Sequence, residues 1–161
     1  MIKALTVGLL IATAICQTVS AKADPIPTQF DSQGEDRQAI EELLSTYTKA
    51  VSTKNQALYE TLLLNKDIPF SGASSAIKKA ADAEHPTQNY ESFRKGVFEG
   101  PPFTQRFQNV TIQQDGPLAQ VSLVYVNTAP DGSNWGWKTV QLLKIAGHWK
   151  IVSEFYNGHA G

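Results

Sequence analysis

The sequence contains almost no cysteine. Cys16 is the only one among 161 residues, and it lies in a segment that we expect to be removed from the mature protein. A chain with a single thiol forms no internal disulfide. Loss of Cys16 would also exclude a thiolate metal site and a cysteine nucleophile.

The sequence also lacks an excess of charge of either sign. The formal net charge is −1 at pH 7, charged residues make up 18% of the chain, and no basic run occurs. Nucleic-acid binding needs a basic stripe, and the glycine-rich phosphate-binding motifs are missing as well. No two histidines have HxH or HxxxH spacing. We therefore expect no nucleic-acid partner, no cofactor and no metal.

The N-terminal segment has the pattern of a secretory signal peptide. Lys3 gives a positive charge, and the apolar stretch 4–15 is too short to cross a bilayer comfortably. Val19 and Ala21 place small residues where a signal peptidase requires them, which predicts cleavage after Ala21. An uncleaved anchor is the alternative. The prediction is a secreted or periplasmic protein with no membrane attachment after cleavage.

The rest of the chain divides into an extended leader, residues 22–35, and one folded domain, residues 36–157. A first helix is expected over residues 36–53, because apolar residues recur there at the helical period. They are Ile40, Leu43, Leu44, Tyr47 and Val51. Asn55 can cap a second helix that continues to about Leu64.

Residues 73–100 are expected to hold a third helix, which starts at Thr87 or Asn89 and stops before Gly100. The alanine- and lysine-rich stretch 73–84 before it favours a solvated helix. A mobile flap is the alternative for this stretch.

Four segments with alternating apolar residues end the chain: 103–114, 118–128, 135–145 and 148–156. Short turn signals separate them, and connections of this kind join antiparallel neighbours. Helices followed by a meander imply an α+β protein, with one curved sheet and helices on a single face. Such a sheet can enclose a pocket.

Several segments occur in the order of a known fold. They are the helix 39–47 with its break at Lys54-Asn55, the hairpin 109–121, and the closing stretch 147–152. In this order they resemble the nuclear transport factor 2-like (NTF2-like) superfamily, which includes ketosteroid isomerases and SnoaL-like polyketide cyclases. The resemblance covers about residues 36–156. It implies a cone-shaped fold, with about three helices on one curved antiparallel sheet, and a homodimer that pairs through the sheet.

The ketosteroid isomerases provide a test for enzymatic function. Their chemistry needs a carboxylate base after the second helix, and a tyrosine and a protonated acid that hold the enolate oxygen. Tyr47 aligns with that tyrosine. The base position falls near residues 70–72, which lack a carboxylate although Asp67 is close, and the acid position falls near Gln141. Tyr47 and Asp67 are therefore only weak catalytic candidates, and Tyr47 is alternatively a core residue.

An apolar cavity with few polar groups is the usual ligand site. The residues that we expect to line one are Tyr47, Tyr59, Tyr125, Trp137 and Gln141. Alternatively, they form the core and a dimer surface. The leading hypothesis is binding of a small, largely apolar ligand without catalytic machinery. The alternatives are a SnoaL-like or isomerase-type enzyme, and a protein-interaction module that uses the outer face of the sheet.

Glu154 is expected to lie outside that cavity. Strict alternation along the last strand places Glu154 opposite Trp149 and Ile151. Because the side that bears Trp149 is the more apolar, we expect it to face the helices. Glu154 would then face solvent or a dimer interface.

Overall fold

The structure is a computed structural model that describes residues 29–81 and 89–161. One five-stranded sheet has the strand order β1-β5-β4-β3-β2. The strands β2 (Thr104–Asp115), β3 (Leu118–Ala129), β4 (Gly132–Ile145) and β5 (His148–Ala160) form an antiparallel meander. The short β1 (Phe70–Gly72) pairs with β5 in parallel. The predicted α+β class with a curved antiparallel sheet is confirmed.

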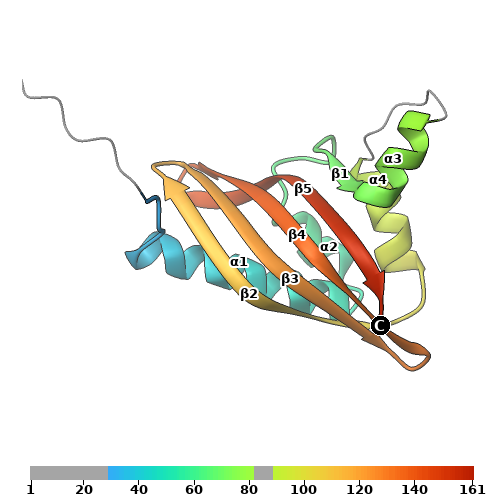
Figure 1. Cartoon of the computed structure of the whole chain (residues 1–161). Helices are drawn as coiled ribbons and strands as arrows, with labels where there is room; N and C mark the ends of the chain where they lie inside the picture. The colour runs from blue at the N-terminus through green and yellow to red at the C-terminus, as the bar shows by residue number, and fades with distance from the viewer. Residues whose placement is uncertain (1–28, 82–88) are drawn as a thin grey trace, which may run out of the picture.

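The helices precede the meander. They are α1 (Gly34–Ser52), α2 (Gln56–Glu60), α3 (Ala73–Ala81), and α4 (Tyr90–Arg94), which continues into a π-helical turn, η1 (Lys95–Glu99). Figure 1 shows α1 and α2 along one face of the sheet, with α3 and α4 near β1 and one end of β5. Residues 73–81 are therefore helical, as the composition of the stretch predicted, and the mobile-flap alternative does not hold for them.

The second helix is shorter than expected, although Asn55 caps it by accepting a hydrogen bond from the amide of Leu58 at 2.9 Å. The backbone leaves the helical path after Glu60 because it pairs with β5. Ile151 donates to the carbonyl of Leu62 at 2.8 Å and accepts from the amide of Leu64 at 2.9 Å. Tertiary hydrogen bonds replace the helical ones over these residues.

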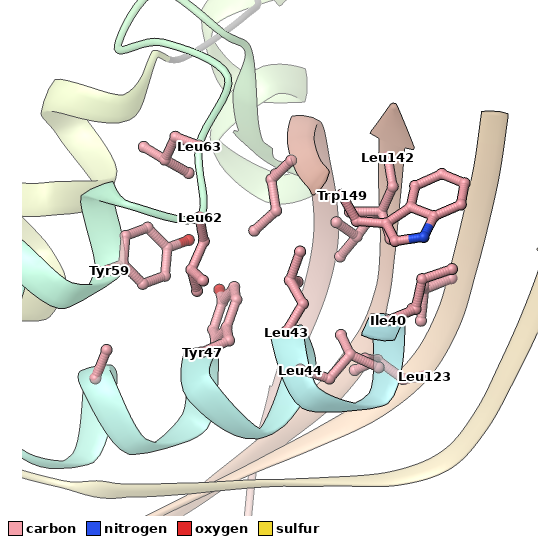
Figure 2. Close-up of a cluster of buried hydrophobic side chains, with 14 of the residues drawn as sticks. Ile40, Leu43, Leu44, Tyr47, Tyr59, Leu62, Leu63, Leu123, Leu142 and Trp149 are labelled. Carbon is pink, nitrogen blue, oxygen red and sulfur yellow. The ribbon is translucent and has the colours of Figure 1, made fainter. Parts of the chain in front are cut away.

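The core lies between α1, α2 and the inner face of the sheet (Figure 2). The apolar stripe of α1 is buried, as its spacing predicts, and it packs with the inward residues of the strands. Fully burying one such aliphatic or aromatic side chain contributes roughly 1.5–3 kcal/mol. The inward strand residues include Ile112, Val121, Leu123, Val140, Leu142 and Ile151.

Two bulges bend the sheet. The first lies in β2, where the register shifts between Gln108 and Thr111, and Asn109 takes a left-handed φ of 51°. The second lies in β5, where Gln141 pairs with Ser153 and Leu142 pairs with Ile151, which leaves Val152 as the extra residue. A bulge reverses the inward and outward alternation beyond it. The second bulge therefore decides which face of the sheet Glu154 occupies.

Residues 29–33 run beside β2. The carbonyl of Phe30 accepts a hydrogen bond from the amide of Gln114 at 2.5 Å, and the amide of Ser32 donates to Ile112 at 3.1 Å. The predicted signal peptide and its cleavage site lie outside the described residues. Across 29–81 and 89–161, no helix combines the length and apolar character needed to span a membrane.

Candidate ligand-binding site

A charged pair is buried between the helices and the sheet. The ammonium nitrogen Nζ of Lys138 lies 2.6 Å from Oε1 of Glu154, and their exposed fractions are 3% and 0%. Tyr47, also fully buried, connects the two. Its hydroxyl donates to Glu154, 2.9 Å from Oε2 and 3.1 Å from Oε1, and accepts from Nζ of Lys138 at 2.6 Å. Three residues from α1, β4 and β5 thus form one hydrogen-bonded cluster.

Burial governs the protonation of this cluster. It lowers the pKa of Lys138, because desolvation disfavours the ammonium, while the carboxylate of Glu154 acts in the opposite direction. Burial and then the charge of Glu154 raise the pKa of Tyr47 well above its ordinary value. Tyr47 is therefore a neutral hydroxyl, able to donate to Glu154 and accept from Lys138 at the same time.

Aromatic rings surround the ammonium of Lys138. Its Nζ lies 4.7 Å from the ring centroid of Tyr47, 5.3 Å from that of Tyr125, and 5.6 Å from that of Tyr156. Phe93 and Phe107 follow at 5.8 and 5.9 Å. Cation–π attraction partly replaces the lost hydration of the charge.

A cavity of about 300 Å³ opens next to this cluster. Lys138 forms part of its wall, together with aromatic side chains on the sheet, on α4 and in the loop before β2. They are Phe93, Phe103, Tyr125 and Tyr156, and the turn η1 adds Gly96 and Val97. The cavity wall thus combines aromatic side chains with polar groups and one cationic group, in nearly equal polar and apolar shares.

Three amide side chains form the polar part of the wall. Nε2 of Gln105 donates to Oδ1 of Asn127 at 2.7 Å, and Nδ2 of Asn127 donates to Oδ1 of Asn134 at 2.9 Å. All three residues line the cavity. The oxygen Oε1 of Gln105 is buried and has no hydrogen-bond partner among the residues that the structure describes. A buried, unpaired acceptor of this kind can be satisfied by a donor on a bound molecule.

The segment that carries η1 is fastened by Lys54, which lies in the turn between α1 and α2. Its ammonium donates to the carbonyls of Val97, Gly100 and Pro101, the last at 2.8 Å, and lies 4.8 Å from the ring centroid of Phe103. Because Val97 and Phe103 line the cavity, Lys54 fixes this part of its wall.

The residues predicted to line one cavity do not all lie on the same side of the sheet. Tyr125 lines the cavity, while Tyr47 and Tyr59 are buried behind it, in contact with each other at a centroid distance of 4.8 Å. Figure 2 shows the hydroxyls of Tyr47 and Tyr59 pointing into the same interior region. Burial raises the pKa of Tyr59 well above its ordinary value.

The placement of Trp137 and Gln141 in the same cavity is wrong. Both alternate with the buried Lys138, Val140 and Leu142, so they point to the outer face of the sheet. Trp137 is 58% exposed, and its indole nitrogen donates to Ser122 at 2.8 Å. Gln141 borders a separate hollow of about 280 Å³ with Phe30 and Leu118.

The expected outward position of Glu154 is also wrong, and the bulge at Val152 is the reason. Because of that extra residue, Trp149, Ile151 and Glu154 all face inward, while Phe155 is 46% exposed. Asp67, the second weak catalytic candidate, is exposed in the loop after α2, where its amide donates to Asn65 at 2.8 Å. The carboxylate that accompanies Tyr47 is therefore Glu154.

Lys138 was missed by the sequence analysis. The only signal that could have identified it is its place in β4, on the face it shares with Val140 and Leu142. A lysine on an apolar strand face is buried only with a partner. That partner, Glu154, is 16 residues away in sequence. The bulge at Val152 cannot be recognised in the sequence, so strict alternation assigns Glu154 to the wrong face of the sheet.

The sheet order, the helices on one face and the cavity between them define the NTF2-like fold, as the resemblance implied. An NTF2-like protein of unknown function from Shewanella baltica matches with a TM-score of 0.58 and 16% identity, over 79% of this chain and 96% of that one. A protein of unknown function with a cystatin-like fold, from Nostoc punctiforme, gives 0.60 and 15%, over 80% and 95%. These identities establish the fold alone.

A third similar structure is a putative Ca/calmodulin-dependent kinase II association domain from Exiguobacterium sibiricum. It has a TM-score of 0.63 and 10% identity, over 81% of this chain and 98% of that chain. No protein-family model and no curated protein matches the sequence. Within the described residues, no group of three or more histidine, cysteine or acidic side chains is placed to hold a metal ion.

Proposed function

We propose that the protein binds a small, uncharged and largely apolar ligand in the cavity beside Lys138. The observation that carries the proposal is the cavity itself, about 300 Å³ in volume, whose aromatic wall contains one buried ammonium and one buried, unpaired amide oxygen. Burying such groups costs desolvation free energy, and a bound ligand that pairs with them recovers part of that cost.

The charge balance favours a neutral ligand. The ammonium of Lys138 and the carboxylate of Glu154 cancel at 2.6 Å, so an anion would have to compete with Glu154 for the lysine. Gln105 lines the cavity, and its Oε1, which has no partner among residues 29–81 and 89–161, is an acceptor for a hydrogen-bond donor on the ligand. A planar apolar body with one or two polar atoms fits the wall formed by Phe93, Tyr125 and Tyr156.

Native mass spectrometry of the protein purified from its own host, together with thermal shifts, tests this proposal. We expect a co-purifying molecule, or stabilisation by neutral aromatic compounds that exceeds stabilisation by carboxylates of the same ring size. Binding at 100 times Kd would add about 2.7 kcal/mol to the stability of the folded state.

The variant Gly96→Leu should block the cavity. Gly96 lines it, and a Cβ at this position meets no atom within 4 Å, so the new side chain enters open space. Ala57→Leu adds the same chain to the exposed surface of α2 and is the matched control. Ligand binding that survives Gly96→Leu, or the lack of any ligand in both assays, would overturn the proposal.

The outer face of the sheet supports a second proposal, self-association into a homodimer. Trp135, Trp137 and Phe155 are 45%, 58% and 46% exposed there, and exposed apolar side chains that cluster are typical of interaction surfaces. A hub of Ca/calmodulin-dependent kinase II from S. rosetta is among the structures with this fold. Analytical ultracentrifugation tests it, and a monomer at every concentration would refute it.

We also propose that the protein is exported, because the sequence begins with a signal-peptide pattern. The expected mature chain starts at Lys22. An intact mass that retains Met1 on protein from the native host would contradict this proposal.

A further inference from the structure

The lysine in the cavity wall has surroundings that suit chemistry as well as binding. Its side chain is 3% exposed, it lines the cavity, and it shares that wall with Tyr125 and Tyr156. A small molecule held in the cavity therefore lies against the lysine side chain. A buried lysine with a lowered pKa has a larger share of the neutral amine, which is the nucleophilic form.

A proton acceptor for the amine is already in place. Oε1 of Glu154 lies 2.6 Å from Nζ, and the Tyr47 hydroxyl lies 2.6 Å from Nζ and 2.9 Å from Oε2 of Glu154. A proton can therefore pass from the ammonium to the carboxylate without crossing water.

We propose that Lys138 forms a reversible imine with the carbonyl group of an aldehyde or ketone bound in the cavity. This inference depends on the proposed ligand-binding function, and it assigns the class of ligand. Carbonyl compounds with an apolar body are neutral, so they agree with the charge balance of the site.

The step balances without any further reactant. Glu154 takes one proton from the ammonium, and the neutral amine adds to the carbonyl carbon. Glu154 passes that proton to the carbonyl oxygen and takes another from the new C–N nitrogen, which gives a neutral carbinolamine and leaves Glu154 protonated. Glu154 then protonates the hydroxyl, the C–O bond breaks, and water leaves as the nitrogen lone pair forms the C=N bond. Overall, an ammonium and a carbonyl compound give an iminium and one water molecule, and hydrolysis reverses the reaction.

Another partly buried lysine provides an internal contrast. Burial lowers the pKa of Lys54 as well, but its ammonium donates to three backbone carbonyls, those of Val97, Gly100 and Pro101. Three donors satisfied by carbonyls hold the proton on the nitrogen, since none of these acceptors takes up a proton. Imine formation is therefore expected at Lys138 and not at Lys54.

Reductive trapping on the purified full-length protein tests the proposal. The probe is 2-naphthaldehyde at one equivalent with sodium cyanoborohydride, which reduces an iminium to a stable secondary amine. Peptide mapping by mass spectrometry then locates the label. We expect Lys138 to take up at least about ten times more label than the average exposed lysine. This factor is small compared with the rate enhancement that holding two reactants next to each other can give.

Two variants and one further probe show whether labelling depends on Lys138 and on binding in the cavity. Lys138→Arg keeps a cation for Glu154 and should lose the label, and Gly96→Leu should lose it by filling the cavity. The alcohol 2-naphthalenemethanol has the same ring without a carbonyl, and its thermal shift reports binding alone. Preferential labelling of Lys138 that both variants abolish supports the imine.

The failure of the imine and the failure of the binding site give different results. If the alcohol stabilises the wild type but not Gly96→Leu, while Lys138 is labelled no more than Lys54 and the exposed lysines, the imine is refuted and ligand binding stands. If neither the aldehyde nor the alcohol stabilises the protein and Lys138 is not labelled preferentially, both proposals fall.

Discussion

Glu154 and Lys138 meet on the inner face of the sheet, with Oε1 and Nζ 2.6 Å apart. They lie diagonally across β4 and β5, since the register pairs Lys138 with Tyr156 and Glu154 with Val140. This contact exists because Val152 is an extra residue in β5. Without it, strict alternation from Trp149 would direct Glu154 away from Lys138.

Removing either member of this pair should destabilise the fold strongly. Glu154→Gln leaves the ammonium of Lys138 buried without its counter-ion, and Lys138→Met leaves the carboxylate of Glu154 buried without its counter-ion. We therefore expect each variant to lower the free energy of unfolding by about 3–5 kcal/mol. The double variant should cost clearly less than the sum, because it leaves no unpaired charge. Urea unfolding of the four proteins measures the coupling.

The exposed pair of Arg37 and Glu41, 2.9 Å apart on α1, is the control for this cycle. Glu41→Gln should change stability by about 0.5 kcal/mol or less, because solvent screens that interaction. Additive effects at Lys138 and Glu154 would show that the two charges do not stabilise each other.

Two tyrosines with similar burial should respond differently to loss of the hydroxyl. Tyr47→Phe removes a donor to Glu154 and an acceptor for Lys138, so we expect a loss of about 1–3 kcal/mol. The hydroxyl of Tyr59 is buried and has no hydrogen-bond partner among residues 29–81 and 89–161. Tyr59→Phe should therefore change the free energy of unfolding by less than about 1 kcal/mol. Equal losses in chemical denaturation would contradict the described hydrogen bonds.

Stability should fall in alkaline solution. Burial, and then the carboxylate of Glu154, raises the pKa of Tyr156 from 10.0 to about 12 in the folded state. Below pH 10 both states keep the proton and the stabilisation is complete. As the pH rises from 10.0 toward 12, the unfolded chain ionises first and the stability declines.

The expected slope is about 1.4 kcal/mol per pH unit for each such tyrosine, less for the partly exposed Tyr156. Tyr47 and Tyr59 contribute in the same direction, since their folded-state pKa values are also raised. Urea midpoints measured across the alkaline range for the wild type and Tyr156→Phe test this. A variant whose stability declines as steeply as that of the wild type would exclude a contribution from Tyr156.

Variants on the two faces of the sheet should affect self-association and ligand binding separately. Trp137→Gln changes the outer face, where the indole is 58% exposed, and should weaken self-association while ligand binding in the cavity is retained. Val97→Trp narrows the cavity, so it should weaken ligand binding while self-association is retained. Sedimentation velocity and thermal shifts, run on both variants, measure the two properties. Loss of ligand binding in Trp137→Gln would place the ligand site on the outer face.

The sequence identified those features that depend on local pattern. The helical period of Ile40, Leu43, Leu44 and Tyr47 identified the buried stripe of α1, and Asn55 identified the start of α2. The four alternating segments after residue 103 gave the meander, because period-2 patterns and short turns are encoded within a few residues.

The site required the tertiary structure. Val152 reads as an ordinary strand residue, yet its place as a bulge reverses the faces of Glu154 and Phe155. Lys138, on the apolar face of β4, can be recognised as a site residue only from its contacts with Glu154 and Tyr47. Tyr47 is 91 residues away in sequence. Residue pattern alone thus determined the elements and their order, because these follow from local periodicity. Which charges are buried together was decided by strand register, which is set by pairing between distant parts of the chain.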